Sequence, residues 1–120
     1  MPTFDSDGVK IAYIDEGSGP DNSLPVLLIH GFASNIDANW VNPGWVQLLA
    51  SEGYRVIALD NRGHGQSEKL YDTASYGAPL MAEDARRLLD HLGIAKAHVF
   101  GYSMGARIAA CLAIGHGDRV

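Results

Sequence analysis

Near the end of the chain stands the octapeptide His98-Val99-Phe100-Gly101-Tyr102-Ser103-Met104-Gly105. Its first three residues are typical of a buried strand, and the small and apolar residues from Ala106 to Ile114 predict a helix that is buried on most sides. The glycines on both sides of Ser103 permit a strained turn between strand and helix. Such a turn would present the Ser103 hydroxyl at a helix N-terminus, where partial positive charge stabilises a developing anion. The pattern therefore favours a nucleophilic serine over an inert serine at a helix start.

Two further apolar runs precede this stretch. Val26 to Ile29 and Val56 to Leu59 show no polar alternation, which is typical of strands buried on both faces of a parallel sheet. Residues Thr3 to Asp15 are rich in β-branched and aromatic side chains around a turn at Asp7-Gly8, and they predict a β-hairpin. We expect an α/β fold with a mostly parallel sheet, an antiparallel N-terminal hairpin and flanking helices.

Helices are expected between these strands. One has Asn42 as its N-cap and Pro43 in its first turn. The other begins at Pro79, and its charged residues, Asp84 among them, are expected on the face opposite the apolar stripe. The polar, glycine-containing segment from Asn61 to Gly77 predicts a long loop with short helical turns.

Composition bounds the class of protein. The 120 residues include 9 lysines and arginines, 14 aspartates and glutamates and one cysteine, with a net charge of −5. We expect one domain over residues 1–120, no disulfide, and no nucleic-acid partner, because no basic face is available for phosphates. The start of the chain lacks a signal peptide and no apolar run approaches the ~20 residues that span a bilayer, so we expect a cytoplasmic protein without a membrane partner. No metal-ligand spacing or cofactor motif occurs, so neither metal nor cofactor is expected.

His30-Gly31-Phe32 follows the first apolar run directly. Acyl transfer needs two backbone N–H donors aimed at the oxyanion, one after the nucleophile and one from the loop after this strand. We expect these donors to be the amides of Met104 and Phe32. Gly31 allows close approach of the backbone to a substrate, and His30 is expected to fix the loop rather than to transfer a proton.

A third motif, Asp60-Asn61-Arg62-Gly63-His64-Gly65-Gln66-Ser67, follows the second apolar run. Its glycines predict a tight turn, and Asp60 and Arg62 are expected to form a buried pair that fixes it. A phosphate-binding loop is disfavoured, because the lysine of a P-loop is absent.

Together these motifs resemble the N-terminal half of an α/β-hydrolase, the superfamily of esterases, lipases, epoxide hydrolases and dehalogenases. The resemblance covers Phe4 to Val120. It implies that Ser103 is the nucleophile, supported by Gly101 and Gly105, and that the Phe32 and Met104 amides form the oxyanion hole. The resemblance also bears on the substrate. Dehalogenases and epoxide hydrolases of this fold have aspartate at the position of Ser103, so serine in this turn favours ester or thioester cleavage.

The acid and the general base of the family are not found after Ser103. The fold orders its triad serine, acid, histidine, and only 120 − 103 = 17 residues follow Ser103. His116 would lie about 20 Å away along the helix. His30 and His64 alone lie at the expected catalytic end, so a Ser103–His30 dyad is conceivable. The alternative function is an idle, shortened hydrolase-like oligomer or binding module.

A partner is expected at the strand His98 to Tyr102. The family places another strand beside it, and here it would form an exposed apolar edge. We therefore expect a homodimer or higher oligomer joined near Val99 and Phe100, or along the helix from Ala106 to Ile114.

Overall fold

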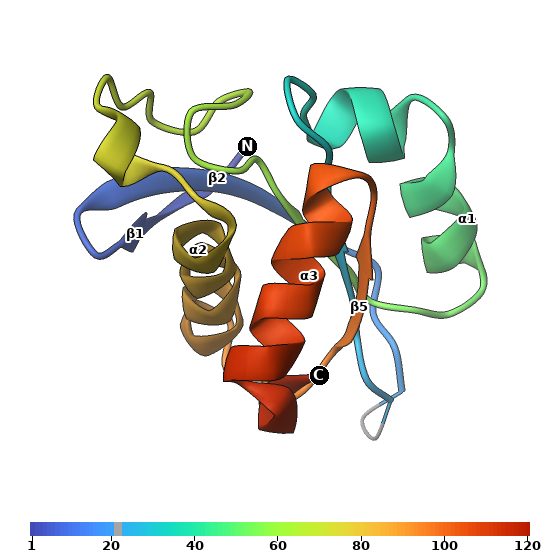
Figure 1. Cartoon of the computed structure of the whole chain (residues 1–120). Helices are drawn as coiled ribbons and strands as arrows, with labels where there is room; N and C mark the ends of the chain where they lie inside the picture. The colour runs from blue at the N-terminus through green and yellow to red at the C-terminus, as the bar shows by residue number, and fades with distance from the viewer. Residues whose placement is uncertain (21–22) are drawn as a thin grey trace.

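The computed structural model describes residues 1–20 and 23–120. Five strands form one sheet in the order β1-β2-β4-β3-β5 (Figure 1). Their bounds are β1 (Thr3–Ser6), β2 (Val9–Glu16), β3 (Val26–Ile29), β4 (Val56–Leu59) and β5 (His98–Gly101). The hairpin β1-β2 is antiparallel and β3 pairs in parallel with both β4 and β5, as the sequence predicts. Strand β2 also pairs antiparallel with β4, which extends the antiparallel part beyond the hairpin.

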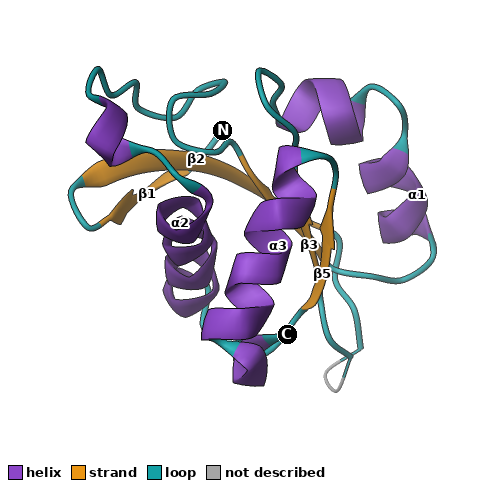
Figure 2. Cartoon of the chain, in the orientation of Figure 1, coloured by secondary structure: helices purple, strands orange, loops and turns teal. Residues whose placement is uncertain are grey.

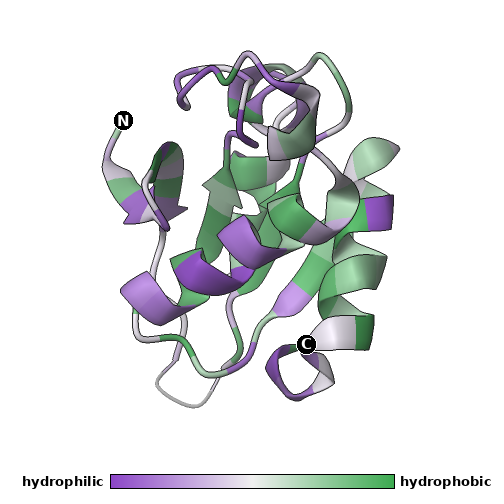
Figure 3. Ribbon diagram, turned by 60° about the vertical axis from the view of Figure 1, so that its left-hand side comes forward, coloured by the Kyte–Doolittle hydropathy of each residue, from purple (hydrophilic) through white to green (hydrophobic). Residues whose placement is uncertain are grey.

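Helices cover both faces of the sheet (Figure 2). Helices α2 (Ala78–His91) and α3 (Met104–Gly115) lie on one face, and α1 (Trp45–Ser51) lies on the other. Alternate side chains of β3 and β4 enter the two layers, because successive residues of a strand point to opposite faces. The α2 and α3 layer receives Leu27, Ile29, Ile57 and Leu59. The α1 layer receives Leu28, Val56 and Ala58. Figure 3 shows these central strands as a hydrophobic band through the molecule.

The segment before α1 differs from the sequence prediction. Asp37–Val41 forms a π-helical turn, and the Asn42 amide donates to the Asp37 carbonyl at 2.8 Å to close it. Helix α1 then begins at Trp45, after Gly44 with φ of 96°. The prediction of Asn42 as its N-cap is wrong, because the left-handed backbone at Gly44 breaks the chain between the two turns.

Helix α2 buries one of its charged residues. Asp84 has no exposed surface, so its expected place on the outward face is wrong. Its carboxylate accepts hydrogen bonds from Arg62 and from the Ser6 hydroxyl, which compensate its burial. The loop before α2 has the predicted form, with one 3₁₀ turn at Thr73–Ser75.

Strand β5 and helix α3 are more exposed than predicted. Phe100 is 54% exposed and Ile114 is 87% exposed. In α3 the fully buried residues are Gly105, Ile108 and Leu112, so the expected burial on most sides is wrong. The physical reason is position: β5 is the last strand of the sheet, and within the described residues no strand covers its outer edge. The exposed edge is confirmed, and the oligomer that it would join stays a prediction.

The described residues contain neither a membrane-spanning helix nor a metal-binding cluster. Among them, no helix is both long and apolar enough to cross a bilayer. Within the same part of the chain, no cluster of histidine, cysteine, aspartate or glutamate is arranged to hold a metal ion.

Candidate active site

Ser103 occupies a strained turn between β5 and α3. Its φ is 57° and its ψ is −116°, which a residue with a side chain rarely adopts. Glycines make the turn possible. A Cβ at Gly105 would collide with the Ile29 carbonyl of β3, and a Cβ at Gly101 would collide with the Gly105 carbonyl. The turn predicted from the sequence is therefore present, and it places the exposed Ser103 at the N-terminus of α3.

The loop after β3 lies against this turn. A Cβ at Gly31 would stand 3.2 Å from the Tyr102 carbonyl oxygen and 3.3 Å from the Ser103 Cβ, so glycine permits the close approach. Within the described residues, neither the Phe32 nor the Met104 backbone N–H donates to a protein acceptor. Met104 follows Ser103 directly in the chain, and Phe32 borders the same hollow as Ser103. The oxyanion-hole role of these two amides stays a prediction.

His30 ties the start of the loop after β3 to the loop after β4. The ring is fully buried, its Nε2 accepts from the Asn61 N–H at 2.9 Å, and its Nδ1–H donates to the Gly31 carbonyl at 2.7 Å. Because an amide N–H can only donate, the ring is the neutral Nδ1–H tautomer. Burial lowers the pKa of His30 from 6.5, against a smaller raising effect of the Gly31 hydrogen bond. These contacts tie His30 to the loops after β3 and β4, and no hydrogen bond joins it to Ser103, since both ring nitrogens are engaged.

The prediction that Asp60 and Arg62 pair with each other is wrong. The two carboxylate oxygens of Asp60 accept from the backbone amides of Ile36 at 2.8 Å and Gln66 at 2.9 Å, which satisfies them without a cation. Arg62 points instead to α2. Its Nε and Nη2 each donate to Asp84 at 2.8 Å. The hydrogen bond to Asp84 raises the pKa of Arg62.

Sequence reasoning missed Asp84, although a signal was present. Asp84 lies three residues after Met81 and four before Leu88, both of which are buried on α2. Residues at this spacing share one face of a helix. An aspartate on the apolar face requires buried hydrogen-bond partners, and Arg62 and Ser6 supply them here.

His64 connects the two loops at this end of the sheet. Its Nε2 accepts from the Ala33 N–H at 3.1 Å, and its Nδ1–H donates to the Arg62 carbonyl at 3.0 Å. The Phe32 ring packs edge-on against it, with centroids 6.0 Å apart. The loop after β4 therefore supports the loop after β3 beside Ser103. The sequence placed His64 at this end without indicating the contact with Ala33.

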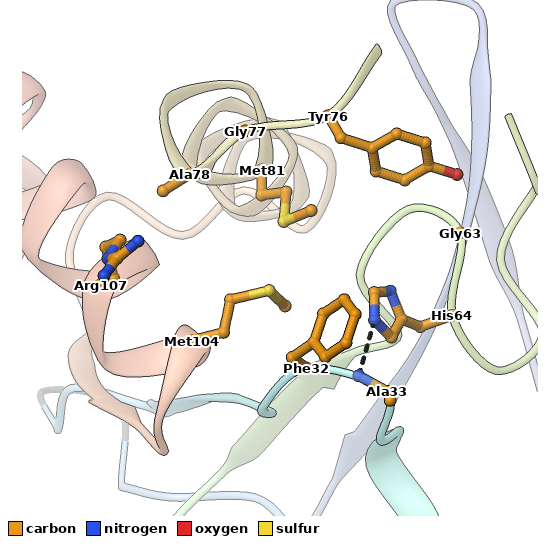
Figure 4. A pocket seen from close by; sticks show the side chains of 10 residues that line it. All are labelled: Phe32, Ala33, Gly63, His64, Tyr76, Gly77, Ala78, Met81, Met104 and Arg107. Atoms are coloured by element: carbon orange, nitrogen blue, oxygen red, sulfur yellow. Dashed lines mark hydrogen bonds between the residues drawn. The ribbon is translucent and has the colours of Figure 1, made fainter. Parts of the chain in front are cut away.

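Two hollows open beside these loops. The larger, about 620 Å³, lies between the loops and helices α2 and α3 (Figure 4). It is lined by Phe32, Ala33, Gly63, His64, Tyr76, Gly77, Ala78, Met81, Met104 and Arg107. The smaller, about 500 Å³, is lined by Phe32, Ser103, Met104 and Arg107. Ser103 thus faces a space bordered by apolar side chains and one guanidinium.

The histidines do not reach Ser103. All five lie in the described part of the chain, and none of them is hydrogen-bonded to its hydroxyl. His91 stacks on Phe4, with ring centroids 5.3 Å apart. His116 lies 2.8 Å from Glu83 and, with Arg86, lowers the pKa of that carboxyl. No general base for Ser103 is therefore in place among the described residues.

Comparison with known proteins gives consistent matches. The family described as alpha/beta hydrolase fold matches residues 25–120. The dihydrolipoyllysine-residue acetyltransferase component of an acetoin cleaving system from Cupriavidus necator is 40% identical over 116 residues, which are 97% of this chain and 29% of that protein. Epoxide hydrolase 3 from Siraitia grosvenorii is 35% identical over 98% of this chain and 35% of its own length. An epoxide hydrolase structure from Vigna radiata superposes with a TM-score of 0.88 at 27% identity, covering 99% of this chain and 37% of that one. The chain spans about a third of the length of these relatives.

Proposed function

Since this chain belongs to the α/β-hydrolase family, we propose that it carries the nucleophile and the oxyanion-binding amides of a serine hydrolase for carboxylic esters or thioesters. The observation that carries the proposal is Ser103 itself, held in a strained backbone conformation, with the unbonded amide of Met104 next to it in the chain and that of Phe32 on the neighbouring loop. Strain of this kind costs about 1–3 kcal/mol and persists where surrounding structure imposes it, most often at functional sites.

In the proposed reaction, Ser103 Oγ attacks the carbonyl carbon while its proton passes to a general base. The carbonyl oxygen gains the electron pair and is bound by the Phe32 and Met104 amides. Collapse of the tetrahedral intermediate breaks the C–O or C–S bond, and the leaving group takes the proton. Water then hydrolyses the acyl-serine by the same steps. No described side chain is hydrogen-bonded to Ser103 as a base. We therefore propose that the general base comes from additional chain, such as the longer relatives have, or from a second subunit.

Serine chemistry supports esters over the substrates of some relatives. Attack of a serine hydroxyl on an epoxide or a carbon–halogen bond would form an ether, which water does not cleave under mild conditions. Attack on an ester or thioester forms an acyl-serine ester, which water does cleave. The similarity to an acetyltransferase component, a protein whose name describes acyl transfer, points the same way.

The second candidate is a catalytically idle oligomer or binding module. It is favoured by the missing base near Ser103 among the described residues and by the exposed outer edge of β5. Sedimentation that finds only a monomer would count against the oligomer.

The test is the intact mass of the chain after incubation with a fluorophosphonate. A single adduct that Ser103→Ala abolishes and Ser51→Ala retains would support the hydrolase. Ser51 is a matched control, because it is also exposed but lies at the end of α1. No adduct on the unaltered chain would overturn an activated Ser103 in this chain and leave the second candidate.

A further inference from the structure

Arg107 differs from every other arginine of the chain. The sequence holds six arginines, and five of them lie within 4.0 Å of a carboxylate: Arg55, Arg62, Arg86, Arg87 and Arg119. Among the residues that the structure describes, Arg107 has no carboxylate partner and donates no side-chain hydrogen bond. Carboxylates outnumber cations in this chain, 14 to 9. Arg107 nevertheless lies where the described part of the fold places no carboxylate beside it.

That position is the cleft beside Ser103. Arg107 lies one helical turn along α3, where its backbone N–H donates to the Ser103 carbonyl at 3.4 Å. It lines the smaller hollow together with Ser103, and it also lines the larger cleft. Figure 4 shows it on α3 at one end of that cleft, with Met104 and Met81 between it and the Phe32 and His64 end.

Apolar groups dominate the rest of the lining. Beyond Arg107, the only titratable side chains of the larger cleft are His64 and Tyr76. Both are occupied, His64 by the Ala33 amide and the Arg62 carbonyl, and the Tyr76 hydroxyl by the backbone of residue 70. A ligand in this cleft therefore meets one positive charge, on a solvent-exposed arginine, among side chains that are otherwise mostly apolar.

We propose that Arg107 binds a carboxylate of the substrate, so that the ester or thioester attacked by Ser103 bears a free carboxylate on a largely hydrocarbon skeleton. This inference rests on the proposed function and names its substrate class. A guanidinium presents two parallel N–H groups that match one planar carboxylate. A single guanidinium without further donors suits a monoanion better than a phosphate dianion. The alternative is a solvated surface arginine that no ligand uses.

The first experiment measures binding without chemistry. Monomethyl adipate and dimethyl adipate share a hydrocarbon skeleton and an ester, and only the monoester has a carboxylate. Each is titrated into the Ser103→Ala chain and followed by backbone amide NMR shifts. We expect the monoester to bind about tenfold more tightly, with less preference in 1 M salt, because salt screens an accessible ion pair.

Substitution of the cation then assigns the preference. Arg107→Met in the Ser103→Ala background should abolish the preference for the monoester while keeping an unbranched apolar stem at this position. Arg55→Met removes the same charge from a remote ion pair with Asp15 and should keep the preference. Equal binding of the two esters, or a preference that survives Arg107→Met, would overturn the inference.

A second readout separates this inference from the proposed function. With Ser103 present, the ratio of kcat/KM for the monoester to that for the diester should fall about tenfold in Arg107→Met and not in Arg55→Met. Carboxylate binding through Arg107 without a fluorophosphonate adduct on Ser103 would refute an activated Ser103 in this chain and keep the subsite. An adduct on Ser103 without carboxylate preference would refute the subsite alone.

Discussion

The ion pair of Arg62 and Asp84 joins the loop after β4 to helix α2. Removing one partner should destabilise the fold strongly, whereas removing both together should destabilise it much less. Asp84 is fully buried and Arg62 is 6% exposed. Two hydrogen bonds of 2.8 Å join them, and the Ser6 hydroxyl adds a third to Asp84 at 2.6 Å. Substituting Asp84 leaves the Arg62 charge buried without its carboxylate, and substituting Arg62 leaves Asp84 with only the more distant Arg87, 3.9 Å away. Substituting both leaves no such charge.

The expected magnitudes follow from this burial. Arg62→Met and Asp84→Leu should each lower the free energy of unfolding by about 3–5 kcal/mol, the usual cost of an uncompensated buried charge. The double variant should lose less than either single variant, because an apolar pair of similar volume replaces the ion pair at little net cost. Urea unfolding followed by tryptophan fluorescence measures all four proteins. With a slope of about 1–3 kcal/mol per molar urea, each single variant shifts the midpoint by more than about 1 M.

One result would refute the reasoning: single-variant losses that add up to the loss of the double variant within about 0.5 kcal/mol. Additivity would mean that the two side chains stabilise the fold independently. If a single variant does not fold at all, a folded double variant still supports the coupling. A double variant less stable than both singles contradicts it.

Three further predictions concern the turn at Ser103 and its support. Gly105→Ala should lower the free energy of unfolding by about 3 kcal/mol in urea, because its Cβ would collide with the Ile29 carbonyl, whereas Gly115→Ala, on the same helix in open space, should change it by less than about 1 kcal/mol. Ser103→Gly should exceed Ser103→Ala in stability by about 1 kcal/mol in thermal unfolding, since glycine relieves the strain at φ of 57°; equal stabilities would argue against strain. Burial lowers the pKa of His30, so as pH falls below 6.5 the unfolded chain binds a proton that the folded chain excludes, and the free energy of unfolding should decrease. His30→Gln should reduce that pH slope, and an unchanged slope would contradict the assignment.

The central strands and the turn at Ser103 were predictable because their causes are local. A strand buried on both faces needs apolar residues at every position, so Val26 to Ile29 and Val56 to Leu59 are visible as runs. The close approach of α3 to β3 excludes a side chain at Gly105, and the glycine is visible in the sequence. The resemblance to hydrolases rests on the same local features.

The predictions for Asp84 and α3 failed because they depended on contacts far along the chain, whereas the prediction for the start of α1 failed for a local reason. Asp84 is 78 residues from Ser6 and 22 from Arg62, so no local pattern pairs them. The apolar composition of α3 is that of a buried helix, and its exposure depends on what lies beyond β5, which α3 does not encode. The start of α1 was set by the left-handed backbone at Gly44, which prevailed over the capping preference of Asn42.

The turn at Ser103 also bears on how new reactions arise in this scaffold. Its backbone is held by contacts of Gly101 and Gly105, and the side chain at position 103 takes no part in either. A thiol in Ser103→Cys or a carboxylate in Ser103→Asp would therefore stand at the same point of the turn. The reactive group is interchangeable while the frame around it stays constant. A single codon change can then exchange the group that this turn presents without redesign of the surrounding protein.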